Sequence, residues 1–431
     1  MRRFRVDSER DMCERYGVEM VYQRRLVGGL ASGVLRGPLP TFGGISALLC
    51  YLVLAILLWG TIVEGQVDIS GMLDVAYKQD IGRGEGEGNS EINSSIKGAS
   101  PFNLVRARFF VDSEIGEGIA VATTLLYDQG LGHVEVEGGY VIFEGLGRWE
   151  GGNAKVGKFA TPFGSFAARS FGLVNPLVGL PLIYHYFSAV QGNRVPADNA
   201  EQLGFRDVGH YRGRGLPTMY DACWNSGIEV FGPAGKVEYA IALTKGALSN
   251  PDAIDNDGVQ FVGRVGAEPT MGLRLGFSLA YGPYLQAGAG RGANFPAGKS
   301  VEDFNQFIYG VDFEYSRGHL QIFAEGVRNS WEVPNLQQDS LGNTGGYIEG
   351  KYAILPGFYC SARYGQIIYD EIDDGVGGEA SWDYDVRRVE SGLGYYFHRN
   401  VHAKAVVQLN FWDGAADEDD HMVGAQLASF F

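Results

Sequence analysis

The feature that most constrains the fold is a two-residue alternation of apolar and polar side chains. In VDISGMLDVAYK, residues 67–78, odd positions are mostly apolar and even positions mostly polar. Successive side chains of a β-strand point to opposite faces, so the pattern predicts half-apolar strands. Similar runs recur at 105–112, 237–244, 273–281, 307–315 and 401–411, and no comparable helical period appears after residue 66.

The connections between these runs differ in length in a regular way. Short turns such as GPAG (232–235) and HRN (398–400) alternate with longer polar stretches such as 79–101 and 370–385. A transmembrane barrel has tight turns at one end and longer loops at the other. We count about sixteen strands, an even number as bacterial barrels require. The predicted fold is therefore all-β, a single transmembrane antiparallel β-barrel over residues 66–431.

Residues 1–65 form a separate leader. The apolar run ISALLCYLVLAILLWG, residues 45–60, follows Arg24, Arg25 and Arg36 and precedes small or turn-forming residues. This order is typical of a secretory signal peptide and predicts removal of 1–65 near Gly65, with export of the barrel. Extended to Val63, the run approaches the ~20 residues of a membrane helix. An uncleaved inner-membrane anchor carrying a periplasmic β domain is therefore an open alternative.

Composition and motifs exclude several classes of protein. The formal net charge is -16, which argues against nucleic acid as a partner. The four cysteines include no CxxC pair, and the acidic loops lack the ligand spacing of an EF-hand. Neither HExxH nor GxSxG occurs. We therefore expect no metal, no cofactor and no catalytic residue, and not an enzyme, although a barrel enzyme or adhesin-type barrel is a rival interpretation.

The polar faces of the strands predict the lining of a lumen. Unpaired charges cannot face lipid, so charged side chains at polar positions should point into a watery interior, where they set the field that ions meet. The pore-lining candidates carry both signs of charge: Arg106, Arg108, Arg264, Arg274, Arg363, Arg388, Lys404, Asp74, Asp312 and Glu314.

The longest loop, residues 172–222, is too long for an idle connection. It concentrates basic or potentially basic side chains in an acidic chain: Arg194, Arg206, His210, Arg212 and Arg214. Folded inward, these constriction-loop candidates would narrow the channel and favour anionic solutes. Packing over a neighbouring subunit, or a lid on the outer face, are the alternatives.

The residues before this loop predict a hinge. Pro162 removes a ladder donor and Gly164 permits a bend, with Phe163 between them. A strand would leave the sheet here and turn the loop inward. At the other end of the chain, Phe431 shares parity with Val423 and Leu427 on the lipid face of the last strand. That strand must pair with the first one, because an open edge in lipid would leave backbone groups unpaired.

One stretch carries a family resemblance. In VGKFATPFGSFAARSF (156–171), Gly157-Lys158 followed by Pro162-Phe163-Gly164 resembles the GKxxxPFG stretch of bacterial outer-membrane porins of the phosphate-selective O/P-like group. The resemblance implies a 16-stranded barrel, usually trimeric, that conducts small solutes passively. It also implies that Phe431 serves as an assembly signal. Phosphate selectivity is not carried over, because only Arg106 and Arg108 are adjacent on one lumen face and carboxylates are common.

The expectation is an outer-membrane porin of a Gram-negative-type bacterium. Small hydrophilic solutes or ions would diffuse passively, selected by lumen charges and the long loop. The expected partners are outer-membrane lipid and lipopolysaccharide, the barrel assembly machinery, and two further copies in a homotrimer.

Overall fold

A computed structural model describes residues 67–81, 101–146, 151–206, 215–338, 340–413 and 421–431. Strands dominate these residues, and no helix among them is long and apolar enough to cross a membrane. The helices are short: α3 (Asn199–Phe205) and the 3-10 turns η2 (Ala167–Arg169), η3 (Leu182–Tyr184), η4 (Ala289–Arg291) and η5 (Val301–Asp303). The predicted leader, with its apolar run 45–60, lies outside the described residues.

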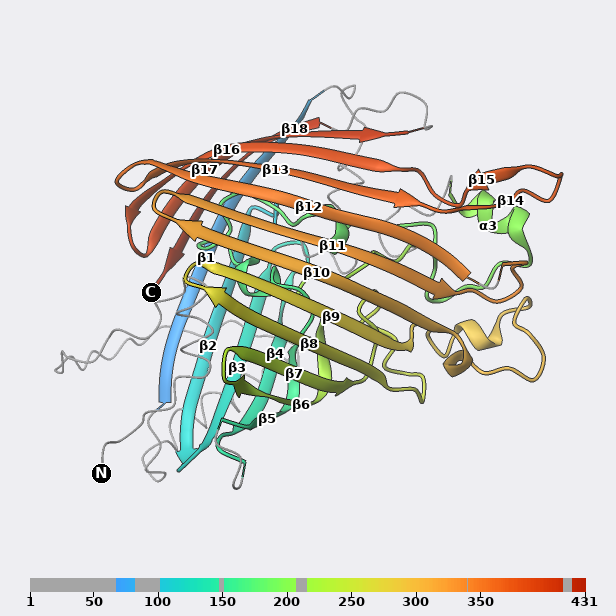
Figure 1. The fold of residues 1–431 in the computed structure, drawn as a ribbon, viewed down its shortest axis with the longest axis horizontal. Helices are drawn as coiled ribbons and strands as arrows, with labels where there is room; N and C mark the ends of the chain where they lie inside the picture. The colour runs from blue at the N-terminus through green and yellow to red at the C-terminus, as the bar shows by residue number, and fades with distance from the viewer. Residues whose placement is uncertain (1–66, 82–100, 147–150, 207–214, 339, 414–420) are drawn as a thin grey trace, which may run out of the picture.

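Sixteen antiparallel strands close into one barrel, which confirms the predicted fold (Figure 1). Strands β14 (Glu371–Asp373) and β15 (Glu379–Ser381) form a separate small sheet within the connection between β13 and β16. The barrel strands are β1 (Val67–Ile81), β2 (Val105–Gly116), β3 (Ile119–Asp128), β4 (His133–Phe143), β5 (Asn153–Ala160), β6 (Trp224–Ala234), β7 (Val237–Thr244), β8 (Gln260–Thr270), β9 (Leu273–Pro283), β10 (Asn305–Arg317), β11 (Leu320–Glu332), β12 (Ser340–Leu355), β13 (Phe358–Tyr369), β16 (Val386–His398), β17 (Val401–Trp412) and β18 (His421–Phe430).

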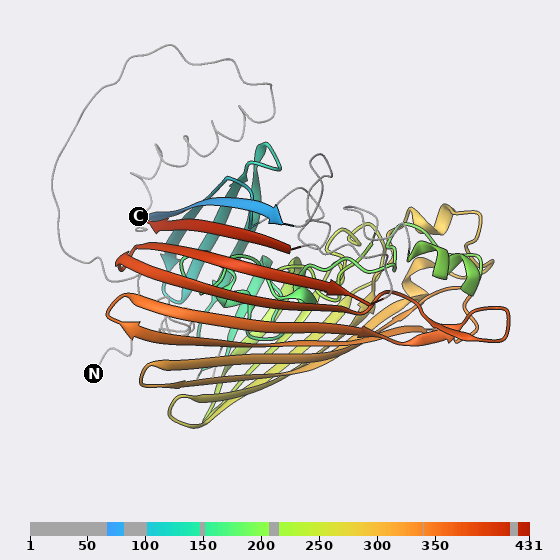
Figure 2. The same cartoon turned by 90° about the horizontal axis from the view of Figure 1, so that it is seen from above.

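The barrel closes where β1 pairs with β18, and the two strands lie side by side in Figure 2. Beyond the last paired residues, the Gly71 N–H donates to the Phe431 carbonyl at 2.8 Å and the Phe431 N–H donates to the Gly71 carbonyl at 2.9 Å. A Cβ on Gly71 would lie 2.5 Å from the Phe431 ring, so glycine leaves room for that ring. The ring also meets Phe109 edge-to-face at 6.4 Å. The C-terminal residue is therefore part of the closure.

The two faces of the wall differ as the alternation predicts. Large apolar side chains such as Tyr77, Phe277 and Val311 are exposed on the outside, while inward neighbours such as Asp74 and Asp312 are buried. An apolar outer band is what a lipid environment requires of a closed barrel.

Tight turns gather at one end of the barrel, the turn end, and longer connections at the other, the loop end. Two connections depart from this rule. The link 129–132 at the loop end is short, and the turn-end connection 144–152 is long. The short link is closed by Asp128, whose carboxylate accepts the Gly130 N–H at 2.8 Å, a local side-chain turn that strand periodicity does not reveal.

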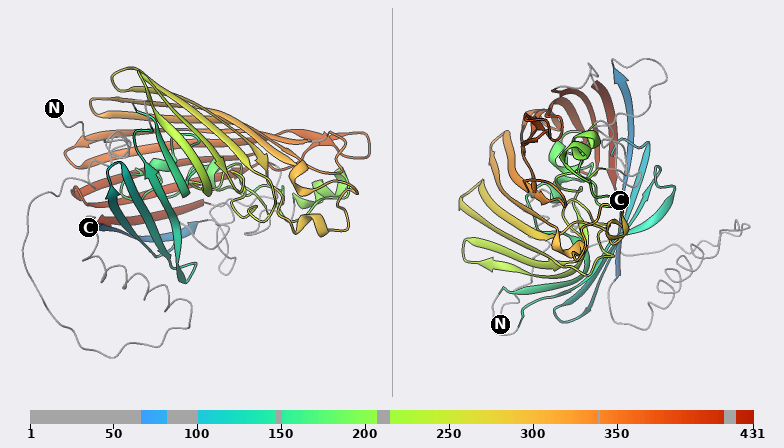
Figure 3. Two further views of the ribbon diagram at one scale, coloured as in Figure 1. Left: turned by 90° about the horizontal axis from the view of Figure 1, so that it is seen from below. Right: turned by 90° about the vertical axis from the view of Figure 1, so that its right-hand side faces the viewer.

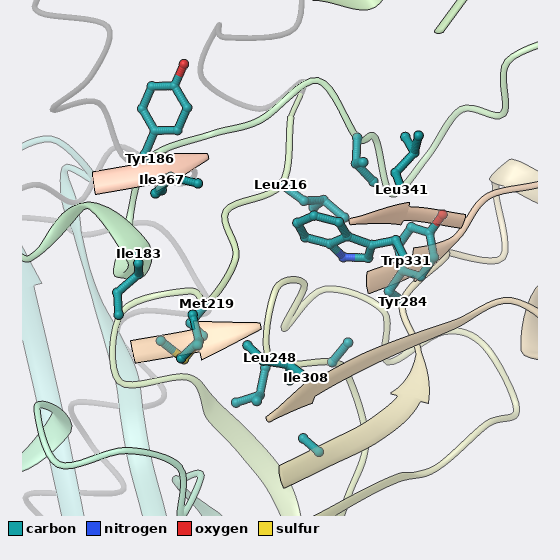
Figure 4. Close-up of a cluster of buried hydrophobic side chains, with 14 of the residues drawn as sticks. Ile183, Tyr186, Leu216, Met219, Leu248, Tyr284, Ile308, Trp331, Leu341 and Ile367 are labelled. Carbon is teal, nitrogen blue, oxygen red and sulfur yellow. The ribbon is translucent and has the colours of Figure 1, made fainter. Parts of the chain in front are cut away.

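The described part of the chain between β5 and β6 crosses the interior of the ring of strands and reaches the loop end, where α3 lies beside β14 and β15 (Figure 1 and Figure 3). We call its described residues, 161–206 and 215–223, the inserted segment. Apolar side chains of the inserted segment, such as Ile183, Leu216 and Met219, form one buried cluster with inward residues of the wall such as Ile308 and Trp331 (Figure 4). The main hydrophobic core of this protein therefore lies inside the barrel.

Candidate functional site

The inserted segment leaves and rejoins the wall at one point. Both the N–H and the hydroxyl of Thr161 donate to the Cys223 carbonyl, at 3.0 and 2.6 Å. Gly164 has a φ of +64°, and a Cβ there would lie 2.6 Å from the Tyr184 hydroxyl oxygen. The predicted hinge residues Pro162, Phe163 and Gly164 thus lie directly after β5, at a bend that only glycine adopts without strain.

Glu325 on β11 anchors the start of the inserted segment. Its carboxylate accepts the Ser165 hydroxyl at 2.8 Å, together with the Ser165 N–H and the Tyr184 hydroxyl. Burial, reinforced by the Glu325 carboxylate, raises the pKa of Tyr184 well above its usual value, so this hydroxyl stays protonated and donates. The Gly164 N–H adds a bond to the Ser278 hydroxyl at 3.1 Å.

A buried chain of alternating charges continues from η2 across the wall. Arg169 donates to Glu349 at 2.8 Å, and Glu349 accepts a second bond from Arg363 at 3.0 Å. Arg363 also donates to Glu390, with one contact at 2.9 Å. Only 2% of Arg363 is exposed. Each charge in this chain has an opposite partner, which is the condition under which buried charge is tolerated.

Two further basic side chains hold backbone carbonyls of the inserted segment. The Lys404 ammonium donates to Gly172 at 2.8 Å, to Leu177 at 2.9 Å and to Asn175. Arg388 donates to the Leu180 carbonyl at 3.1 Å. Arg363, Arg388 and Lys404 were predicted to line a pore; they point inward but are buried beneath the inserted segment and hold it.

Five buried, charged side chains that point inward from β1 to β4 form what we call the arginine wall: Asp74, Arg106, Arg108, Asp128 and Glu137. Arg106 lies 2.8 Å from Asp128. Arg108 makes a two-pronged pair with Glu137 at 2.7 and 2.8 Å, and its other side lies 4.0 Å from Asp74. Both arginines are therefore neutralised by carboxylates.

A second group of candidates lies on β8 to β10. Arg264 makes a two-pronged pair with Asp312, with one contact at 2.9 Å. Arg274 lies 3.9 Å from Glu314 and keeps 22% of its side chain exposed, against 12% for Glu314. Arg274 and Glu314 thus reach solvent inside the barrel, whereas Asp312 is buried like the side chains beneath the inserted segment.

The described basic residues of the long loop contact neighbouring loop atoms. Arg194 is 55% exposed and pairs with Glu201. Arg206 donates to the Ser381 carbonyl at 3.0 Å, so it contacts another loop. His210, Arg212 and Arg214 lie outside the described residues. Arg194 is thus paired with a carboxylate, whereas Arg206 keeps its charge, and a narrowing role for these residues stays a prediction.

Sequence reasoning missed several residues that organise the lumen. Glu349 lies on the inward face between Tyr347 and Lys351, so strand parity could have marked it. Glu137 sits beside a register shift in the pairing of β3 with β4, which breaks simple parity. Asp221 lies in an irregular stretch that carries no periodic signal.

Reactive groupings are sparse. His402 lies 2.6 Å from the Tyr359 hydroxyl and stacks on Tyr396 at 4.1 Å between ring centres. Among the described residues, no group of three or more His, Cys, Asp or Glu side chains could hold a metal ion. The inward charged side chains can exert an electrostatic field on ions inside the barrel, and the inserted segment can restrict the size of solutes that enter.

No protein-family model and no curated protein sequence matches the chain. Solved structures do match. A loop-deletion mutant of OmpT, an outer membrane protein of Vibrio cholerae, is 14% identical over 85% of this chain and 99% of that one, with a TM-score of 0.55. Outer-membrane expressed OmpT of Vibrio cholerae gives 14% identity, 85% and 98% coverage, and a TM-score of 0.50.

Salmonella typhi OmpF, in complex with daunomycin, is 11% identical over 85% of this chain and 97% of that one, with a TM-score of 0.51. At such identities the likeness concerns the fold alone. A closed barrel of sixteen strands with an apolar outer band has no edge to leave unpaired in lipid. The protein therefore has the closed β-barrel fold that these outer-membrane proteins share.

Proposed function

We propose that the protein is a passive channel for small hydrophilic solutes or ions. The observation that carries this proposal is the uneven filling of the lumen. The inserted segment covers one part of the wall, while charged inward side chains such as Arg274 and Glu314 remain in contact with solvent. A barrel serving only as a scaffold would have no need for accessible charges of both signs inside it.

Transport in this proposal needs no catalytic step and no cofactor. The inserted segment limits solute size, and fixed charges favour or oppose each ion that enters. Phosphate selectivity is not proposed, because Arg106, Arg108 and Arg264 are each paired with a carboxylate. A pore built for phosphate would leave such guanidinium groups free to donate to the anion.

Planar-bilayer conductance tests the proposal. Purified, folded barrel should insert and give stable conductance steps that scale with salt concentration. Protein unfolded before addition is the control and should give none. Correctly folded barrel that inserts into the bilayer but stays silent would contradict the proposal.

We further propose that copies associate through the outer face near β5. Lys158 lies between Val156 and Ala160 on the outward parity of this strand, and its ammonium donates to the Val136 carbonyl at 3.0 Å. A lysine facing lipid costs about 2–4 kcal/mol at the membrane midplane, so cover by a second subunit would be favourable. The resemblance to porins suggests three copies. Native mass determination of the wild type and of K158E tests the proposed association. A monomeric wild type would contradict it.

Lipopolysaccharide contact is proposed at the loop end. Arg328 and Arg387 lie at outward positions near the loop ends of β11 and β16, where they pair with Asp370 and Asp413. Strand β12 has 16 residues, more than the roughly 9–11 that cross the hydrocarbon core. These side chains therefore reach the level of polar head groups. Loss of co-purifying lipopolysaccharide in an R328Q/R387Q variant would support the proposal, and unchanged content would oppose it.

A further inference from the structure

The return end of the inserted segment holds an aspartate in a fixed position. The Asp221 N–H donates to the Tyr184 carbonyl at 2.8 Å, and the Cys223 N–H donates to the Tyr220 carbonyl at 2.7 Å. Asp221 and Cys223 have φ values of +45° and +47°, in the left-handed region. Non-glycine residues keep this conformation only where the surroundings impose it. The fold therefore specifies the place of the Asp221 side chain.

Asp221 lies in the electrostatic field of the arginine wall. The charges that act on its carboxyl are those of Arg106, Glu137 and Arg108. As a residue Asp221 is partly exposed, whereas the five residues of the wall are buried. Asp221 is thus the acidic residue of this group that the rest of the chain covers least.

The charges of the wall cancel without Asp221. Arg106 pairs with Asp128, and Arg108 pairs with Glu137. Asp74 lies between Arg108 and Lys404, whose positive charges both act on it. Three cations thus face three carboxylates, and among the described residues no ion pair joins Asp221 to a cation. Its carboxylate is a surplus negative charge at this level of the lumen.

The groups on neighbouring stretches do not reverse this balance. Lys155 pairs with Glu229 at 3.3 Å, and Arg264 pairs with Asp312. Arg274 lies between two carboxylates, Glu268 and Glu314, each at 3.9 Å. These three groupings therefore add no unpaired positive charge to the balance of the arginine wall.

We propose that Asp221 makes the channel prefer small cations, inorganic or ammonium, over anions of similar size. This inference rests on the proposed channel function. A fixed carboxylate near the path lowers the energy of a cation there and raises that of an anion, and partial exclusion of bulk water strengthens the effect. The preference is opposite in sign to that expected from a basic constriction loop.

Reversal potentials in a KCl gradient test the inference on the full-length barrel. Wild type should favour potassium, and D221N should lower the potassium-to-chloride permeability ratio several-fold with little change in total conductance. D221E retains the charge and should restore the wild-type ratio. D374N is the matched control, because Asp374 lies in the exposed turn between β14 and β15.

Each outcome bears on one of the two proposals. A conducting wild type that favours chloride overturns the inference and leaves the channel intact, even if D221N fails to fold. A D221N variant that conducts with the wild-type potassium-to-chloride permeability ratio also overturns the inference and leaves the channel intact. Folded wild type that inserts without conducting removes the channel itself, and the inference with it.

Discussion

Two parts of the inner wall carry the same kinds of charged side chain and use them differently. On β11 to β16, Glu325, Glu349 and Arg363 are buried beneath the inserted segment and bond to it or to one another. On β8 to β10, Arg274 and Glu314 are 3.9 Å apart and reach solvent. Charge inside a barrel is therefore not in itself evidence of a pore lining. Its role depends on whether another part of the chain covers it.

The largest difference between the two parts should appear when one arginine of each is removed. Arg363→Leu would leave Glu349 and Glu390 buried with a shared partner lost, and breaking such a pair costs about 3–5 kcal/mol. Arg274→Leu should change stability by less than about 1 kcal/mol, since its pairs are long and partly exposed. Urea unfolding in micelles measures both. Equal losses in the free energy of unfolding would show that the two parts of the wall do not differ in how much their charged side chains contribute to stability.

Gly164→Val should free the start of the inserted segment. The left-handed φ and the 2.6 Å approach to Tyr184 cost roughly 1–3 kcal/mol for a branched side chain. We expect larger and noisier conductance steps together with lower thermal stability. Gly235→Val is the control, because its φ is also positive, at +72°, but no atom lies within 4 Å of the added Cβ. Conductance steps in Gly164→Val that are as quiet and as large as those of the wild type would contradict a hinge role for Gly164.

Deletion of Phe431 should slow assembly more than it weakens the finished barrel. It removes two backbone hydrogen bonds to Gly71, each with a net contribution of about 0.5–1.5 kcal/mol, and the ring contact with Phe109. We propose that the terminal residue is also the assembly signal, so the folded yield in the outer membrane should fall. Phe277→Ala, an outward position on β9 away from the closure, is the control. Normal yield after the deletion would contradict the signal role.

Acidification should weaken the cation preference. Partial burial raises the pKa of the Asp221 carboxyl, although Arg106 and Arg108 oppose the shift. As the pH falls, this carboxyl should therefore be protonated before an ordinary aspartate, and its surplus negative charge should be lost. The permeability ratio of the wild type should fall towards that of D221N. A ratio independent of pH in D221N, but not in the wild type, assigns the effect to this residue.

The smallest expected effect concerns the loop arginines outside the described residues. If Arg212 and Arg214 approach the channel, neutralising both should shift the reversal potential towards cations. Arg194→Gln is the control, since Arg194 pairs with Glu201 at an exposed site. An unchanged potential would remove these two residues from the set that controls selectivity.

Strand parity predicted the direction in which side chains point better than it predicted their exposure. Arg106, Arg264 and Arg388 all face inward as expected, because alternation is a local property of extended backbone. Whether each meets water depends on the inserted segment, whose path follows from contacts between residues far apart in the sequence, such as Ser165 with Glu325, which are 160 positions apart. Irregular backbone has no sequence period, so nothing in the sequence marked Asp221. The sequence showed the positive charge of Arg194 but not its pairing with Glu201.

The sequence by itself determined the closed sixteen-stranded barrel, because alternation fixes two faces and lipid does not tolerate an open edge. It also determined that Phe431 lies on the outer face at the closure. Only the tertiary structure decided which inward charges are structural and which reach the lumen. That division depends on how one long segment packs across the barrel, and the balance of buried contacts that selects this path is a property of the whole chain.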